Sequence, residues 1–200
     1  MVHILVAGTF REKKGIPYAL EAFARIRKRH QHVRLTLLGD SAGQLGGEEE
    51  KQKILGVVAR HHLHDSTRWL GFQPYPVFRE MLRTHHLFLS PSMTAEDGDS
   101  EGGCPVSITE AQATGMPVVS TFRADIPEVV VDGQTGLLSP ERDVEALAAN
   151  LEYLVTHPDR WPEMGRRARE RIEQEYNVKV QARRLEEHYS ALVMDKKLPV

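Results

Sequence analysis

Short apolar segments alternate with amphipathic helical segments along most of this 200-residue chain. Segments 3–8 and 87–90 carry apolar residues at consecutive positions rather than at every second one, and segment 33–39 is a further leucine-rich run. Strands with this composition are buried on both faces, which is typical of a parallel sheet covered by helices. The pattern therefore predicts an α/β fold with a Rossmann-like parallel sheet.

We expect about six parallel strands with helices on both faces of the sheet. The predicted strands cover residues 3–8, 33–39, 67–71, 87–90, 117–121 and 135–138. The first predicted helix, 15–30, has the three-to-four spacing of one buried face, carried by Ile16, Leu20, Phe23 and Ile26. Further helices are expected after residue 48, from Pro76, after Pro105 and from Asp125.

The C-terminal part has a different character, because only helical patterns follow residue 142. We expect one domain over residues 1–200, made of an α/β core (1–142) and a helical segment (143–200). Asp143 is a candidate N-cap of the first of these helices. The apolar spacing in the other helices predicts inward-facing side chains at Trp161, Leu185, Tyr189 and Leu192.

Composition restricts the classes of partner. The formal net charge is −2 with acids and bases interspersed, which argues against nucleic acid as the main partner. The single cysteine, Cys104, excludes an intramolecular disulfide and fits a reducing compartment. No signal peptide or membrane-spanning run is recognisable, so we expect a cytoplasmic protein.

An acidic, glycine-bearing loop leads into the short helix after Pro105, and this stretch is the main candidate site. In open parallel sheets, ligands bind beyond the carboxyl ends of the strands. Gly102 and Gly103 precede the helix, where free backbone N–H groups favour a phosphate; the candidate donors are Gly103, Cys104, Val106 and Ser107. Glu110, on the same helix, is then placed for ribose hydroxyls. The alternative is an ordinary glycine-rich loop before a helix.

A basic turn follows the first predicted strand and contains Arg11, Lys13 and Lys14. Guanidinium and ammonium groups at this position are suited to neutralising a diphosphate. The alternative is a solvated basic turn without a ligand.

Two other clusters suggest metals but lack the necessary spacing. The acids Glu96, Asp97, Asp99 and Glu101 do not have the register of a calcium loop. The histidines at 61, 62 and 64 lack the partner ligands of a zinc site. We expect no metal and no other cofactor, and we interpret Cys104 as a packing residue rather than a nucleophile.

These motifs resemble the C-terminal, donor-binding half of retaining glycosyltransferases of the GT-B type, specifically glycosyltransferase family 4. The resemblance extends over essentially the whole chain and is strongest in GTFREKKGIPYALEAF, FLSPS, EGGCPVSITEAQATGMPVVST and DIPEVVVDGQTGLL. It implies that Lys14, with Arg11, binds the donor diphosphate next to Gly8 and Thr9. It also implies that Glu101 and Glu110 are the two acids of the family's catalytic motif, with Glu110 at the ribose.

The chain departs from the family pattern at three positions. Thr9 stands where the family has an arginine, and Asp125 replaces a common glycine. The family's two glutamates are separated by seven residues, whereas eight lie between Glu101 and Glu110. We interpret this as a one-residue glycine expansion, which leaves either Glu101 or Gly102 at the first acidic position.

The function implied by the resemblance is metal-independent transfer of a hexose, with retention of configuration, from a nucleotide sugar in polysaccharide biosynthesis. A UDP-sugar is the expected donor, and a glycan or lipid-linked molecule the expected acceptor. Acceptor recognition, and any peripheral membrane association, would belong to a separate N-terminal domain that we expect this chain to lack. The isolated chain would then bind donor and transfer poorly. The alternatives are a non-catalytic nucleotide-binding or interaction module and, less directly, an epimerase or phosphorylase of similar shape.

Overall fold

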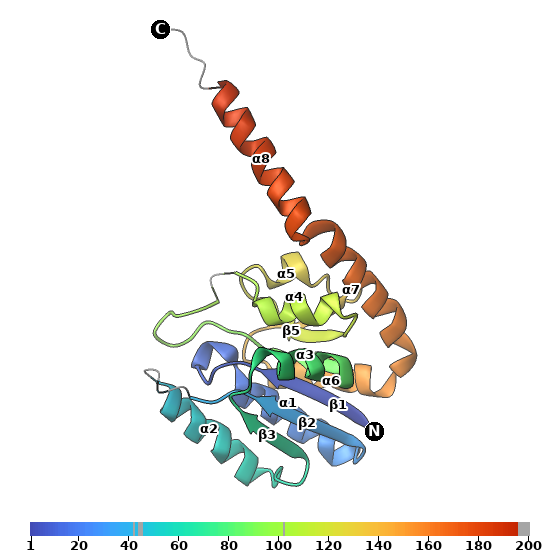
Figure 1. Ribbon diagram of the computed structural model, residues 1–200. Coiled ribbons are helices and arrows are strands. Elements are labelled where there is room, and N and C mark those ends of the chain that lie inside the picture. Colours follow the sequence, from blue (N-terminus) through green and yellow to red (C-terminus); the bar gives the residue numbers. More distant parts are fainter. Residues whose placement is uncertain (42, 44–45, 102, 196–200) are drawn as a thin grey trace.

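A single six-stranded parallel sheet forms the centre of the protein in a computed structural model that describes residues 1–41, 43, 46–101 and 103–195 (Figure 1). All five strand pairings are parallel, and the order across the sheet is β3-β2-β1-β4-β5-β6. The strands are β1 (Val2–Ala7), β2 (Val33–Leu38), β3 (Thr67–Gly71), β4 (Leu87–Leu89), β5 (Val118–Thr121) and β6 (Gly136–Ser139). The predicted α/β class and parallel sheet are thereby confirmed.

Helices cover both faces of this sheet and enclose two apolar clusters. Under one face lie α1 (Ile16–Arg29), α2 (Gly47–Arg60) and α6 (Val144–Thr156). Against the other face lie α3 (Tyr75–Thr84), α4 (Val106–Ala113) and α5 (Ile126–Val129). The next helix, α7 (Trp161–Glu175), begins beside the first cluster and ends beside the second.

Neighbouring side chains of one strand enter different clusters. In β1, Ile4 and Val6 belong to the first cluster, whereas Leu5 between them belongs to the second. All three are essentially excluded from solvent, which explains the continuous apolar character of the segment.

The strand order reverses direction between β1 and β4. The chain leaves β1 for α1 on one face and leaves the adjacent β4 for α4 on the other. The helices that follow these two strands therefore lie on opposite faces of the sheet. The carboxyl ends of β1 and β4 form a switch point, and the crevice outside such a point is where open α/β sheets bind ligands.

The last helix, α8 (Val178–Asp195), projects away from the rest of the protein (Figure 1). Our prediction of inward packing is wrong here, because Leu185, Tyr189 and Leu192 are 52%, 60% and 59% exposed. The spacing of these residues correctly predicts that α8 has an apolar face, but no described part of the chain covers that face. Trp161, by contrast, is partly buried against the first cluster, and its Nε1 donates to Leu154 O at 2.9 Å.

Among the described residues, no helix has both the length and the apolar composition needed to cross a membrane.

Candidate functional site

Two loops meet at the crevice between β1 and β4. The first, residues 8–14, contains the basic turn, and its last part forms a short 3-10 helix at Glu12–Lys14 that we did not predict. The second, residues 90–101, carries the acidic run. Both follow directly from the carboxyl ends of adjacent parallel strands.

The basic turn is held against the second loop by backbone contacts. Met93 N donates to Lys13 O at 2.9 Å. Gly15, which ends the turn, has a φ of 61°, and a Cβ at this position would lie 2.0 Å from Pro91 O. Only glycine fits there without movement of the backbone. The local sequence therefore holds the turn in place.

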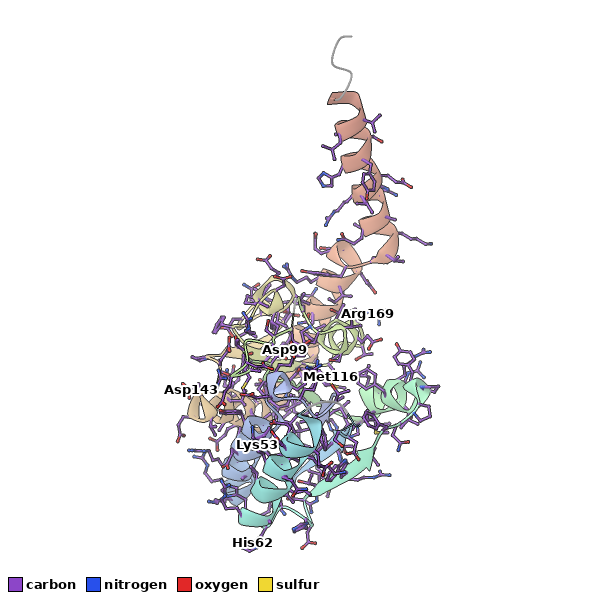
Figure 2. The ribbon with its side chains drawn as sticks, turned by 90° about the vertical axis from the view of Figure 1, so that its left-hand side faces the viewer. Lys53, His62, Asp99, Met116, Asp143 and Arg169 are labelled. Carbon is purple, nitrogen blue, oxygen red and sulfur yellow. The ribbon has the colours of Figure 1, made fainter. Side chains whose placement is uncertain are left out.

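Asp99 pairs with two of the three cations of the turn. Its Oδ2 lies 2.8 Å from Arg11 Nη2, and its Oδ1 lies 3.1 Å from Lys13 Nζ. The hydrogen bond from Lys13 is the main reason that the pKa of Asp99 is lowered. Figure 2 shows Asp99 on the side of the molecule that carries these loops.

Lys14 pairs with Glu101. Lys14 Nζ lies 2.7 Å from Glu101 Oε1, and both side chains are mostly shielded from solvent. Within the described part of the chain, Glu101 Oε1 has no hydrogen bond of good geometry, so the two groups are held by charge. The stem of Lys14 lies over Gly8, since a Cβ on that glycine would be 3.5 Å from Lys14 Cδ.

The start of α4 lies on the other side of the crevice. Pro105 precedes the helix, and none of the described side chains caps its first turn. Val106, in that turn, is 71% exposed, and a Cβ on Gly103 would lie 3.3 Å from Asp125 Oδ2. Ser107 belongs to the same turn. Gly102 lies outside the described residues, so the structure does not bear on its predicted phosphate contact.

Glu110 is on α4, and the phenolic hydroxyl of Tyr75 donates to its Oε1. Tyr75 begins α3, shortly after the carboxyl end of β3. Our sequence reasoning did not identify Tyr75 as a site residue. The feature that could have identified Tyr75 is its position shortly after a predicted strand, at the carboxyl edge of the sheet.

Cys104 is partly buried against the second apolar cluster. Burial raises the pKa of its thiol to about 12, so the thiolate is scarce at neutral pH. These observations support a packing role for its side chain.

A cavity of about 250 Å³ adjoins the basic turn, and its lining includes Arg11, Lys13 and Asp99. A larger cavity of about 480 Å³ lies at the opposite, amino-terminal edge of the sheet, lined in part by His3 and His85. None of the predicted site residues lines the larger cavity. No group of three or more His, Cys, Asp or Glu side chains within the described ranges is arranged to hold a metal ion.

A six-stranded parallel sheet of this order, with helices on both faces, defines a Rossmann-like domain of the kind found in GT-B glycosyltransferases. The chain belongs to the glycosyl transferases group 1 family, which it matches over residues 2–171.

Similarity to individual proteins supports this assignment. The chain is 38% identical over 175 residues to a protein of Salmonella typhimurium named as the colanic acid biosynthesis glycosyltransferase WcaL. The match covers 87% of this chain but only 41% of WcaL, so the chain spans less than half of that relative's length.

Two solved structures share the fold. HepE of Anabaena, in complex with UDP-glucose, superposes with a TM-score of 0.80 at 21% identity, covering 94% of this chain and 48% of HepE. The C-terminal domain of LpcC, a glycosyl transferase group 1 family protein of Francisella tularensis, gives a TM-score of 0.76 at 18% identity, covering 88% of this chain and 87% of that domain.

Proposed function

We propose that this chain is the donor-binding half of a retaining glycosyltransferase of family 4. Its ligand would be a nucleotide sugar, most simply a UDP-hexose, used to extend a glycan or lipid-linked acceptor in polysaccharide biosynthesis. The observation that carries the proposal is the ion pair between Lys14 and Glu101 at the switch point of the sheet. It puts a shielded cation and a carboxylate in the crevice where this class of fold receives its ligand.

The basic turn has the charge needed for a diphosphate. Lys14 and Arg11, assisted by Lys13, would neutralise the phosphoryl oxygens, and the N–H groups at the start of α4 would add to this field. As the bond to the sugar breaks, negative charge grows on the leaving diphosphate. Cations and amides fixed around it lower the energy of that transition state. The proposal needs no metal, because the chain itself supplies the positive charge.

The carboxylates would have different roles. Glu110 accepts from ribose hydroxyls, which places the nucleoside toward α3 and α4. Glu101 is paired with Lys14, and donor binding would release it toward the sugar. If the backbone at position 102 meets the sugar instead, Glu101 would remain a partner of Lys14.

Relatives and neighbours support the wider proposal. HepE was crystallised with UDP-glucose, and WcaL is named for colanic acid biosynthesis. The match to the C-terminal domain of LpcC suggests that this chain is the C-terminal half. An N-terminal half would then bind the acceptor and make any membrane contact, with the enzyme acting in the cytoplasm.

Calorimetric titration of the full chain with UDP, ADP and GDP, and then with the corresponding sugar nucleotides, tests the proposal. We expect saturable binding of at least one nucleoside diphosphate and a weaker response to the nucleoside alone. Lys14→Ala should abolish binding, whereas Lys179→Ala, on exposed α8, should not. The absence of saturable binding for every nucleotide would overturn the proposal. Binding without any transfer when an acceptor-binding half is supplied would instead favour a non-catalytic module.

A further inference from the structure

The hydrogen bond between Tyr75 and Glu110 joins two helices at the carboxyl edge of the sheet. Tyr75 is the first residue of α3, and Glu110 lies within α4. The two residues are 35 positions apart, so the contact is a product of the fold rather than of a local turn.

Two prolines flank Tyr75, and its ring lies beside the ring of Phe78. Pro74 occupies the N-cap position with φ −58° and ψ 148°, and Pro76 lies in the first helical turn. Both prolines restrict the backbone on either side of Tyr75. The centroid of the Tyr75 ring lies 6.3 Å from the centroid of the Phe78 ring, and Phe78 is buried. The prolines and the contact with Phe78 restrict where the phenol can lie, although 57% of Tyr75 is exposed.

Glu110 has a more flexible side chain than Tyr75. A glutamate has three rotatable side-chain bonds, and fixing its carboxylate costs conformational entropy. The hydrogen bond from Tyr75 fixes one oxygen of this carboxylate before a ligand arrives. The same bond raises the pKa of Tyr75, so the phenol stays protonated and remains a donor at neutral pH.

The carboxylate retains capacity for a ligand after this bond is made. An ionised carboxylate has two oxygens and about four lone-pair positions. Tyr75 uses one position on Oε1, which leaves Oε2 and the rest of Oε1 for two further donors. Two adjacent hydroxyls of a ribose are a pair of donors that matches this arrangement.

We propose that Tyr75 is a positioning residue that orients the Glu110 carboxylate to accept both hydroxyls of a ribose. The inference rests on the proposed nucleotide-binding function and adds a source of specificity to it. Tyr75 acts through Glu110 and makes the site favour a ribonucleoside diphosphate over a ligand that offers only phosphate.

The test compares Tyr75→Phe and Glu110→Gln, alone and combined, in the full chain. Each protein is titrated with UDP, with 2′-deoxy-UDP and with inorganic pyrophosphate. Tyr153→Phe is the matched control, because it removes a phenolic hydroxyl from α6 under the opposite face of the sheet. Thermal unfolding of each variant reports any change in stability.

We expect Tyr75→Phe to weaken UDP binding about fivefold or more, in line with the loss of one orienting hydrogen bond. Pyrophosphate affinity should stay within about twofold of wild type, and the preference for UDP over 2′-deoxy-UDP should shrink. In the Glu110→Gln background, Tyr75→Phe should have little further effect on UDP affinity, because the carboxylate that Tyr75 positions has already been removed.

Equal losses for UDP and pyrophosphate, or full additivity with Glu110→Gln, would overturn the inference and indicate a structural tether between α3 and α4. Unchanged or tighter UDP binding by Tyr75→Phe, with Glu110→Gln still impaired, would overturn it while leaving the proposed function intact. If wild type binds none of UDP, ADP and GDP, both proposals fail together.

Discussion

Lys14 Nζ lies 2.7 Å from Glu101 Oε1, and this contact joins the loop after β1 to the loop after β4. Asp99 adds a parallel link, since it pairs with Arg11 and Lys13. The three cations proposed to bind a diphosphate are thus paired with two carboxylates of the protein itself, which offset much but not all of their positive charge. A diphosphate has to displace these carboxylates, and its affinity therefore depends on how strongly the carboxylates bind the three cations.

Glu101→Gln should tighten the binding of inorganic pyrophosphate. The substitution keeps the shape of the side chain but removes the negative charge that faces Lys14. Because the pair is only partly screened by solvent, we expect about a three- to tenfold gain in affinity, measured by calorimetry at low ionic strength. Weaker pyrophosphate binding by Glu101→Gln would contradict the displacement of Glu101 by phosphate.

Asp99→Asn should release Arg11 and Lys13 together. We expect about a two- to fivefold gain in pyrophosphate affinity that shrinks as salt is raised, because ion pairs that solvent partly reaches are weak and screened. Asp159→Asn, which removes an exposed carboxylate beside Arg160, is the control and should change little. An equal gain in both variants would mean that only net charge matters.

Glu50 predicts a pH dependence of stability. Its side chain is buried, and burial raises its pKa despite the nearby Lys53. An acid whose pKa is higher in the folded state favours folding when protonated, and that contribution is lost as the pH rises through the folded pKa. Replacement by glutamine removes this loss.

Denaturant unfolding of Glu50→Gln and wild type should therefore show a stability difference that moves in favour of the variant between about pH 4 and pH 7. Glu49→Gln, at the adjacent exposed position, is the matched control and should show a smaller change with pH. A constant difference between Glu50→Gln and wild type across this range would contradict the assignment.

Deleting residues 178–200 should leave the domain folded. The apolar side chains of α8 from Val178 to Val193 are exposed except for Val180, which is half-buried, so the deletion removes little buried area. We expect the unfolding temperature to change by no more than about 3 °C, which corresponds to about 1 kcal/mol for a domain of this size. A cooperative loss of structure would mean that α8 contributes to the core.

Local pattern was sufficient to predict the strands, the longer helices and the class of fold. The runs at 33–38 and 87–89 are apolar because both faces of the sheet are covered, so composition reported their burial directly. The same reasoning failed for Leu185 and Tyr189, because spacing shows that a helix has an apolar face but not what covers it.

The candidate site was predictable only in its parts. The sequence was sufficient to identify Arg11 and Lys14 as part of a basic turn. It also identified the acids at 96–101 as part of a loop. The pairing of Lys13 with Asp99 joins residues 86 positions apart, and the bond from Tyr75 to Glu110 joins residues 35 positions apart. Such contacts depend on the order of the strands, which brings the loops to one edge of the sheet.

The most direct test of the central claim is an NMR titration of the ¹⁵N-labelled full chain with UDP, following the backbone amides. The account predicts that amides of residues 8–14, 103–104 and 106–110 shift together along one saturable curve, with Tyr75 and Glu110 among the affected residues. Amides of α8 should not shift. Saturable shifts confined to other surfaces, such as the cavity lined by His3 and His85, or no saturable shifts at all, would contradict a shared nucleotide site at the β1–β4 crevice.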